Sequence, residues 1–426
     1  MLDNKNYFRY LKLKEGLGVN HKGYDLKFAM SPFFVFYSYG LRKDFVTKSL
    51  INKCLFFTVN LSEFEKSIKS QSVLFTNSLP GKDHMKLVND VMNNVDNAFY
   101  FDDKILIRIR FNFSNTISSF SNFFLNKTYK DLSFHQKIFF SLNLVYYKNL
   151  INQLEKLPYR IKTCAHVACF SGNNESIFTT FFQKRGIKTY CLQHGLLTAI
   201  NDYKYFIPAD IVSVENLNAD YMLGWGVYSK KVLIQLAFSE TRYLLAGNPK
   251  YSNQNEINIH FGEYKKCILC LSRDIYFKEN LLLLEIASKF QNEGNEVLIK
   301  FHPRNDLEIY ETLIDKFKLK ILETKISIIE SISLFNPDFI IVYNSTVYYE
   351  YYIKGLISFR YSVSANDIPF GLNDEFGDFE ELKSRINEFK NKSKDELTKE
   401  VNEVMNRFCA LGVNNYSEIL NKETSI

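Results

Sequence analysis

The stretch EVLIKFHPR at residues 296–304 decides the fold of the second half of this 426-residue chain. In it, a short aliphatic run ends in a cluster of basic side chains, an imidazole and a proline. The stretch FIIVYNST at residues 339–346 has the same form, because an apolar run again ends in polar residues. Such runs are typical of strands buried on both faces of a parallel sheet, whose ligands bind beyond the carboxyl ends of the strands. The two clusters are therefore predicted to lie at one edge of a sheet and to hold an anionic phosphate between them.

The composition describes a globular protein of two domains, with 46% hydrophobic and 23% charged residues. A net charge of +6 is mildly basic, which suits anionic substrates or a membrane surface. The chain carries no interleaved arginine and aromatic motif of the RNA-binding kind, so we expect no nucleic-acid partner. The seven cysteines, including the CxxC pair Cys267 and Cys270, are expected to be buried free thiols and not a metal or redox site.

The first residues lack the apolar core of a secretion signal, and the sequence has no run of eighteen apolar residues. We therefore expect a cytoplasmic protein with reduced thiols.

Strands and helices are predicted to alternate from about residue 150 onward, which is the pattern of an α/β layer fold. Residues 247–264 are polar and lack apolar periodicity, so they are predicted to link two domains. Each half is predicted to form a Rossmann-like doubly wound sheet, and the two are expected to face one another across a cleft. The predicted parts are an N-terminal domain at 1–250, a C-terminal domain at 251–395 and a helical tail at 396–426.

The elements of the first half are less legible before residue 150. There we predict strands at 55–59, 72–76, 105–109, 163–170, 189–192, 209–214, 221–225 and 243–246, and helices at 134–154, 175–184 and 229–236. In the second half we predict strands at 267–271, 296–301, 320–322, 339–343 and 356–361, and helices at 278–291, 307–317, 326–334 and 346–353.

His302 is predicted to end its strand sharply, because Pro303 fixes φ and removes a backbone donor. Lys300 and Arg304 add positive charge on either side, and the imidazole can donate to a phosphate oxygen as leaving-group charge develops. The alternative is a histidine that only caps a strand turn in a surface loop.

Ser345 is predicted to be the N-cap of the following helix. Its hydroxyl, with Thr346 and the first free N–H groups, would form an anion site. Glu350 lies within that helix, at a distance suited to reaching a ribose hydroxyl. Alternatively, Ser345 or Thr346 only caps the helix and Glu350 is a solvated charge.

Gln193, His194 and Gly195 follow a predicted strand of the first half, where Gly195 permits a tight turn or the close approach of a ligand. His194 can orient an acceptor or exchange a proton near neutral pH, and a structural histidine is the alternative. Asn173 lies in a loop before a helix and can touch an acceptor, although turn chemistry alone explains it.

Three carboxylates, Asp210, Glu215 and Asp220, lie near predicted strand ends, where any of them can act as a base. The spacing of these carboxylates in the sequence does not indicate which of them is the base. No Asp-x-Asp pair is positioned to hold a metal, so we predict neither a metal nor a cofactor.

Six short motifs occur in a familiar order and spacing: QHG at 193–195, PAD at 208–210, GWG at 224–226, AGNPKY at 246–251, KFHP at 300–303 and NSTVYYE at 344–350. Together they resemble bacterial surface-polysaccharide glycosyltransferases of the GT-B fold. The group in question holds capsule Kdo transferases, teichoic-acid glycerophosphotransferases, and bacterial sialyl- and polysialyltransferases. The resemblance covers about residues 160–365, and residues 1–150 match no family that we can name.

The resemblance implies that a CMP- or UDP-linked sugar binds to the C-terminal domain as a substrate. In the family, the histidine of the His-Pro motif and the Ser/Thr pair contact the donor phosphate, which carries over to His302, Ser345 and Thr346. The Gln-His-Gly loop lies on the acceptor side, which implies a role for His194. The acidic motif of the sialyltransferases is not found here, so the general base and the stereochemical course stay open. The glycerophosphotransferases use a second histidine in the first domain, which His194 can supply.

We therefore expect a metal-independent glycosyltransferase that moves a sugar from a nucleotide donor onto a cell-surface polysaccharide, capsule or lipooligosaccharide. The basic balance suggests transient association with the inner leaflet of the inner membrane, where lipid-linked acceptors lie. The alternatives are a non-hydrolysing nucleotide-sugar 2-epimerase, a glycerophosphotransferase of the teichoic-acid type, and a non-enzymatic partner in glycan export or assembly.

Overall fold

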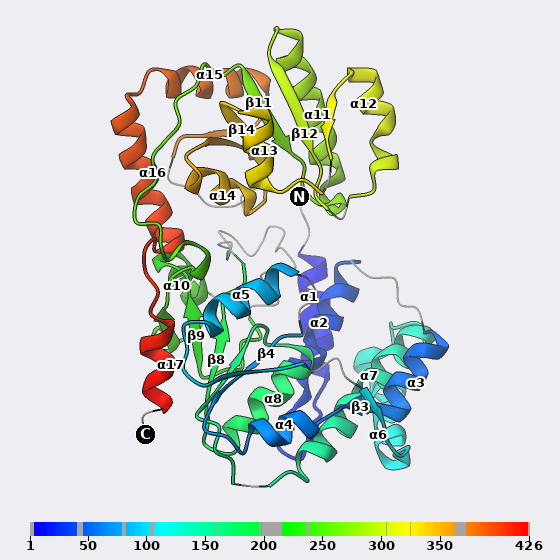
Figure 1. Cartoon of the computed structure of the whole chain (residues 1–426). Coiled ribbons are helices and arrows are strands. Elements are labelled where there is room, and N and C mark those ends of the chain that lie inside the picture. The colour runs from blue at the N-terminus through cyan, green and yellow to red at the C-terminus, as the bar shows by residue number, and fades with distance from the viewer. Residues whose placement is uncertain are drawn as a thin grey trace. The chain divides into compact units, whose positions relative to one another are not determined.

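The chain forms two compact units in a computed structural model (Figure 1). The first unit holds Met1–Ser252 and Val413–Ile426, and the second holds Asn253–Gly412, so the chain passes between the units twice. The structure describes residues 4–40, 46–78, 82–102, 106–158, 160–195, 197, 215–235, 238–303, 305–323, 325–362 and 372–424.

A six-stranded parallel sheet forms the centre of the first unit. Its strands are β4 (Val73–Thr76), β5 (Ala98–Phe101), β7 (Ala165–Ala168), β8 (Lys188–Leu192), β9 (Tyr221–Gly224) and β10 (Tyr243–Leu245). They lie in the order β5-β4-β7-β8-β9-β10, with every neighbouring pair parallel. Numbered along the chain, this is the order 2-1-3-4-5-6, in which the winding changes direction between β4 and β7.

Helices and two short antiparallel ribbons surround this sheet. The helices are α1 (Lys5–Gly16), α2 (Leu26–Ser38), α3 (Lys48–Phe56), α4 (Ser62–Ser67), α5 (Lys82–Met92), α6 (Phe113–Leu125), α7 (Phe134–Leu154), α8 (Asn173–Gln183), α10 (Val227–Gln235) and α17 (Tyr416–Thr424), with single 3-10 turns η1 (Lys127–Tyr129), η2 (Glu240–Arg242) and η3 (Pro249–Tyr251). The ribbons pair β1 (Asn20–His21) with β2 (Tyr24–Asp25), and β3 (Phe57–Val59) with β6 (Leu106–Arg108).

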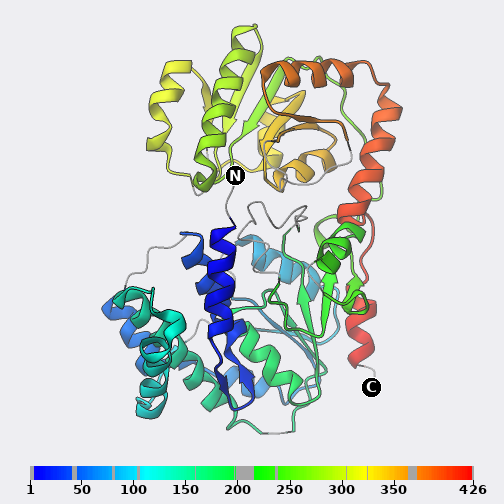
Figure 2. The same cartoon turned by 180° about the vertical axis from the view of Figure 1, so that it is seen from behind.

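A small lobe made of α3, the β3–β6 ribbon, α6 and α7 lies beside the sheet in both views (Figures 1 and 2). Helix α7 begins at a capping box, in which the Ser133 hydroxyl accepts from the Gln136 N–H at 3.3 Å and the Gln136 side chain accepts from the Ser133 N–H at 2.7 Å. Nearly the whole second half of α7 is buried, so this helix holds the lobe to the rest of the unit.

Helix α17 completes the first unit although it comes from the end of the chain. The Tyr416 hydroxyl donates to the Gly247 carbonyl at 2.9 Å, and Leu420 is fully buried in the core of the sheet. The Glu423 carboxylate accepts from the Tyr190 hydroxyl at 2.9 Å. The residues of the predicted tail at 396–426 divide between the units: α16 (Lys394–Cys409) belongs to the second and α17 to the first.

The second unit is built on another six-stranded parallel sheet. Its strands are β11 (Lys266–Cys270), β12 (Glu296–Lys300), β13 (Lys320–Leu322), β14 (Phe339–Tyr343), β15 (Ile357–Tyr361) and β16 (Glu375–Phe376). The order is β13-β12-β11-β14-β15-β16, which along the chain is 3-2-1-4-5-6, and all pairs are parallel. The winding changes direction between β11 and β14, which is where sheets of this topology bind ligands.

The second sheet is flanked by the helices α11 (Phe277–Asn292), α12 (Glu311–Phe317), α13 (Ile328–Phe335), α14 (Val347–Ile353), α15 (Phe379–Lys390) and α16, with 3-10 turns η4 (Asp274–Tyr276) and η5 (Leu307–Ile309). The central strands of this sheet are apolar, which explains why the sheet lies in the core of the second unit. All residues of β14 and β15 are buried, as expected for strands covered on both faces.

The prediction of two doubly wound α/β domains is confirmed by these two sheets. That the two face one another across a cleft stays a prediction. The predicted strand at 209–214 lies outside the described residues. The predicted strand at 55–59 is wrong in its first half, because Leu55 and Phe56 complete the last turn of α3. None of the helices that the structure describes is both long and apolar enough to cross a bilayer.

Glu175 holds the first sheet together at its change of winding direction. This fully buried carboxylate accepts from the N–H and hydroxyl of Ser78 at 2.6 Å each, beyond β4. It also accepts from the N–H groups of Cys169 at 2.6 Å and Phe170 at 3.1 Å, beyond β7. Four donors from two strand ends satisfy one buried charge, which lies in the first turn of α8, where the helix dipole favours an anion.

We expect Glu175→Ala to lower the free energy of unfolding by about 3 to 5 kcal/mol, because it leaves several buried donors unpaired. Glu396→Ala is the matched control, since Glu396 is an exposed carboxylate in the first turn of α16 and should change stability by about 0.5 kcal/mol. Scanning calorimetry of both variants measures the difference. Equal stability of the two would show that Glu175 is not the brace described here.

Candidate functional site

The ends of β12, β11 and β14 form the candidate site. In the sheet register Cys270 pairs with Lys300 on one side and with Val342 on the other. Two residues beyond this row lie Ser272, His302 and Asn344. His302 and the Asn344–Thr346 segment therefore flank the end of β11, roughly 10 Å apart at the backbone from two strand spacings. That the side chains of His302 and Ser345 converge on one phosphate group stays a prediction.

Ser272 ties these three strand ends together. Its hydroxyl donates to the Tyr343 carbonyl at the end of β14. Its N–H donates to the Asn280 side chain at 3.0 Å, and its carbonyl accepts from Asn280 at 2.8 Å and from Asn305 at 2.9 Å. Since Asn305 follows His302, one serine at the end of β11 fixes the loops on both sides of it.

The turn that carries His302 is held by Asp274. The His302 carbonyl accepts from the Asn305 N–H at 2.9 Å, which closes the turn. The Asp274 carboxylate accepts from the Asn305 side chain at 2.8 Å, from the Asp306 N–H at 2.9 Å and from the Tyr310 hydroxyl at 2.9 Å. The half-buried imidazole of His302 therefore stands on a braced turn.

Asn344 and Ser345 form the entry to α14. Asn344 has φ of 40°, in the left-handed region that asparagine tolerates, and its amide donates to the Tyr276 hydroxyl at 2.9 Å. The Ser345 hydroxyl accepts from the Val347 N–H at 3.4 Å, but the residue at the N-cap position is Thr346. The prediction of Ser345 as N-cap is therefore displaced by one residue, while its hydroxyl still faces the first turn.

The other predicted donor-side residues lie around this edge. The Lys300 ammonium donates to the Ile326 carbonyl, and burial lowers the pKa of Lys300. Glu350 is half-buried one turn inside α14, and its charge adds to the burial that raises the pKa of Cys270 to about 12. Thr346 is exposed, Pro303 follows His302 in the turn, and Arg304 lies outside the described residues.

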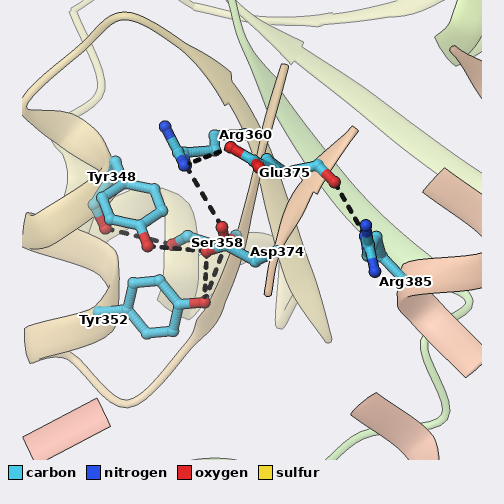
Figure 3. A network of polar contacts seen from close by, with 7 residues as sticks. All are labelled: Tyr348, Tyr352, Ser358, Arg360, Asp374, Glu375 and Arg385. Carbon is cyan, nitrogen blue, oxygen red and sulfur yellow. Dashed lines mark hydrogen bonds and ion pairs between the residues drawn. The ribbon is translucent and has the colours of Figure 1, made fainter. Parts of the chain in front are cut away.

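A polar network centred on buried Asp374 holds α14 to β15 (Figure 3). Fully buried Asp374 accepts from the hydroxyls of Tyr348 at 2.7 Å and Tyr352 at 2.9 Å, both on α14. Arg360 on β15 pairs with Asp374 at 3.4 Å and with Glu375 at 2.7 Å. Arg385 on α15 donates to the Glu375 carbonyl at 3.0 Å. Burial raises the pKa of Asp374 to about 7, against the lowering effect of Arg360 and the two tyrosines.

Sequence reasoning missed Ser272, Asp274, Asn305 and Asp374. One signal was present for the last of these. Arg360 stands in the otherwise buried strand ISFRY, and an arginine there requires a carboxylate partner. The sequence does not say which carboxylate, because Asp374 lies fourteen residues further on.

In the first unit, three side chains meet beyond the ends of β4, β7 and β8. The His194 ring, after β8, contacts the ring of His84 at 5.5 Å between centroids and that of Phe170 at 6.3 Å, both nearly edge-on. His84 lies at the start of α5, which follows β4. The sequence analysis did not single out His84. Its only signal was a histidine soon after the end of a predicted strand.

The other residues that were predicted to lie on the acceptor side have structural contacts. Buried Gln193 donates to the Gly195 carbonyl and the Ser229 hydroxyl at 2.8 Å each, and accepts from the Trp225 N–H at 2.8 Å. A Cβ on Gly195 would meet nothing within 4 Å, so crowding does not require glycine there. Asn173 has φ of 50° and accepts from the Tyr147 hydroxyl at 3.3 Å.

The described carboxylate candidates for a base differ in their surroundings. Asp220 accepts from the N–H of Thr189 at 2.9 Å, from its hydroxyl at 2.8 Å and from Gln183 at 3.0 Å, which is a structural role. Glu215 accepts from the Tyr7 hydroxyl at 2.7 Å, and burial raises its pKa. Asp210 lies outside the described residues.

Among the residues that the structure describes, no three His, Cys, Asp or Glu side chains are grouped to hold a metal ion. All seven cysteines are free. Burial raises the pKa of the Cys267 thiol above its usual range, as it does for Cys270, so neither is a reactive thiolate near neutral pH.

No protein-family model matches this chain, and no curated protein sequence is significantly similar to it. Several solved structures share part of its fold at low identity. The wall teichoic acid polymerase TagF is 13% identical with a TM-score of 0.45, covering 93% of this chain and 98% of that one. Anabaena Alr3699/HepE with UDP and glucose is 11% identical with a TM-score of 0.49, covering 84% and 100%. The UDP-GlcNAc 2-epimerase of Methanocaldococcus jannaschii is 13% identical with a TM-score of 0.44, covering 79% and 98%.

The network around Asp374 predicts a pH dependence of stability. Because its folded pKa of about 7 lies above the ordinary 3.8, the folded state binds an extra proton between these values. This contribution is complete below about pH 4 and is lost as the pH rises through 7, by as much as about 4 kcal/mol. Calorimetry between pH 4 and 8 should show a steeper loss of stability in the wild type than in Asp374→Asn.

Glu380→Gln is the control for this experiment, because it removes a carboxylate of the same unit that is 80% exposed and lies outside this network. It should keep the wild-type slope. An Asp374→Asn variant with that same slope would mean that Asp374 stays charged throughout.

Proposed function

We propose that this protein is a glycosyltransferase that moves a sugar from a nucleotide-activated donor, CMP- or UDP-linked, onto a cell-surface polysaccharide, capsule or lipooligosaccharide acceptor. The observation that carries the proposal is the placement of His302 and the Asn344–Thr346 segment on either side of β11, where the second sheet changes its winding direction. The order of the six motifs, which resembles that of the glycosyltransferase family, favours sugar transfer as the reaction. The second unit would bind the donor and the first the acceptor.

His302 would donate to the phosphate oxygen on which charge develops as the sugar leaves. A donor on a braced turn costs little reorganisation at that moment, and Asp274 and Ser272 supply the bracing. The hydroxyls of Ser345 and Thr346 would bind another phosphate oxygen. Glu350, one turn further along α14, would reach toward the ribose.

His194 would take the acceptor proton in the first unit, in contact with His84. Basic side chains in place of a metal would neutralise the leaving nucleotide. The mildly basic chain would associate peripherally with the inner leaflet to reach a lipid-linked acceptor.

A thermal-shift screen with CMP, CDP and UDP identifies the nucleotide, and release of that nucleotide from its sugar measures turnover. We expect His302→Ala to stay folded and to lose about two orders of magnitude in turnover, as for loss of one charge-stabilising donor. His260→Ala, an exposed histidine of the same unit, should behave as the wild type. Unchanged turnover in His302→Ala removes His302 from the mechanism.

The same assay separates the alternatives. A new sugar epimer formed from the donor alone, with no nucleotide set free, would indicate a 2-epimerase. Transfer from CDP-glycerol with no turnover of any nucleotide sugar would indicate a glycerophosphotransferase. A chain that binds none of the three nucleotides would contradict the enzymatic proposal.

Substitution of the two histidines in the first unit should lower sugar transfer without changing nucleotide binding. We expect His194→Ala to lower transfer about a hundredfold and His84→Ala about tenfold, because the first loses a proton acceptor and the second only its neighbour. Both should keep the wild-type thermal shift with nucleotide. His84→Phe should recover most of the transfer lost in His84→Ala, since it restores a ring against His194. His135→Ala, an exposed histidine of the same unit, is the control. Full transfer by His194→Ala would assign the base to another residue.

A further inference from the structure

The small lobe of the first unit carries an apolar surface that its own fold does not bury. On α6, Asn115, Ser119 and Phe123 are buried. A separate stripe of the same helix holds Phe113, 69% exposed, and Ile117, 50% exposed, with half-buried rings at positions 120 and 124. These positions recur at helical spacing, so they share one face that points away from the buried one.

Ring contacts extend this stripe into neighbouring segments. Phe113 contacts Phe111, which is 43% exposed, at 6.5 Å between centroids. Phe124 contacts Phe120 at 6.0 Å and Phe134, which is 64% exposed, at 5.8 Å. We call this surface the aromatic ridge; it consists of Phe111, Phe113, Ile117, Phe120, Phe124 and Phe134.

Basic residues flank the aromatic ridge along the sequence, with few acidic residues among them. Exposed basic residues precede and follow it, namely Arg108, Arg110, Lys127 and Lys130. The Lys137 ammonium lies 5.7 Å from the centroid of the Phe124 ring. Between residues 106 and 154 the sequence contains a single acidic residue, Asp131, and Lys12 already pairs with it at 3.1 Å. The segment that carries the ridge therefore exposes apolar rings together with basic side chains.

We propose that the aromatic ridge is the surface by which this protein docks on a bilayer of anionic lipid. Contiguous exposed apolar surface marks an interaction site, and phenylalanine beside lysine and arginine is the composition of interfacial membrane binding. Each cation near an anionic leaflet adds to the attraction. A second copy of this face would set the same cations against one another, which disfavours a symmetric dimer.

This inference rests on the peripheral association proposed above and not on the transferase chemistry. It adds which surface of the protein contacts the membrane and which class of lipid that surface binds. Nucleotide binding is measured separately from lipid binding, so the two proposals can fail independently.

Flotation with vesicles tests the ridge. The wild type should float with phosphatidylglycerol-containing vesicles and not with pure phosphatidylcholine, and binding should weaken as salt rises. The double variant Phe113→Ser with Ile117→Ser should bind at least tenfold more weakly, because both exposed apolar side chains are lost. The double variant Arg108→Gln with Arg110→Gln should also bind the anionic vesicles at least tenfold more weakly.

Leu334→Ser is the matched control, since Leu334 is 67% exposed on α13 of the second unit and should leave vesicle binding unchanged. All variants should keep the wild-type thermal shift with nucleotide. Three results would overturn the inference: a wild type that does not float, ridge variants that float as well as the wild type, or a dimer in light scattering that the ridge variants abolish.

Discussion

Parallel pairing in matched register is the constraint on which both units depend. It brings the polar ends of non-consecutive strands to one edge, where each unpaired backbone group needs a partner. In the second unit Ser272 supplies much of this, by bonding the end of β14 and the turn after β12. The loops that carry His302 and Ser345 are therefore fixed by the same hydrogen bonds that close the sheet edge.

The two units join their strand ends with different groups. At the change of winding direction in the first sheet, the carboxylate of Glu175 accepts from both strand ends, so the chain's own anion occupies those donors. At the corresponding place in the second sheet, neutral hydroxyl and amide groups do the joining. The second edge also holds a carboxylate, Asp274, which accepts from the turn that carries His302.

Much of the fold was predictable because its strongest signals are local. The aliphatic strands β12 and β14 and the capped helix α7 are specified by consecutive residues. Burial on both faces is found for β14 but not for β12, in which only Val297 and Ile299 are buried. The braces were not predictable, because Glu175 takes its donors from residues 78, 169 and 170, and Asp374 takes its partners from two other elements. Helix α2 was not predicted for a related reason: Pro32 lies inside it, where a proline normally argues against a helix. Tertiary packing overrides that local preference.

The double passage of the chain between the units has a consequence for how the protein can be divided. Tyr416 and Leu420 fill the core of the first unit from the far end of the sequence. A fragment that stops near residue 250 would leave cavities at their positions, so we expect it to be less stable than the same unit in the full chain. Synthesis of the last fourteen residues thus completes the first unit only after the whole second unit has been made.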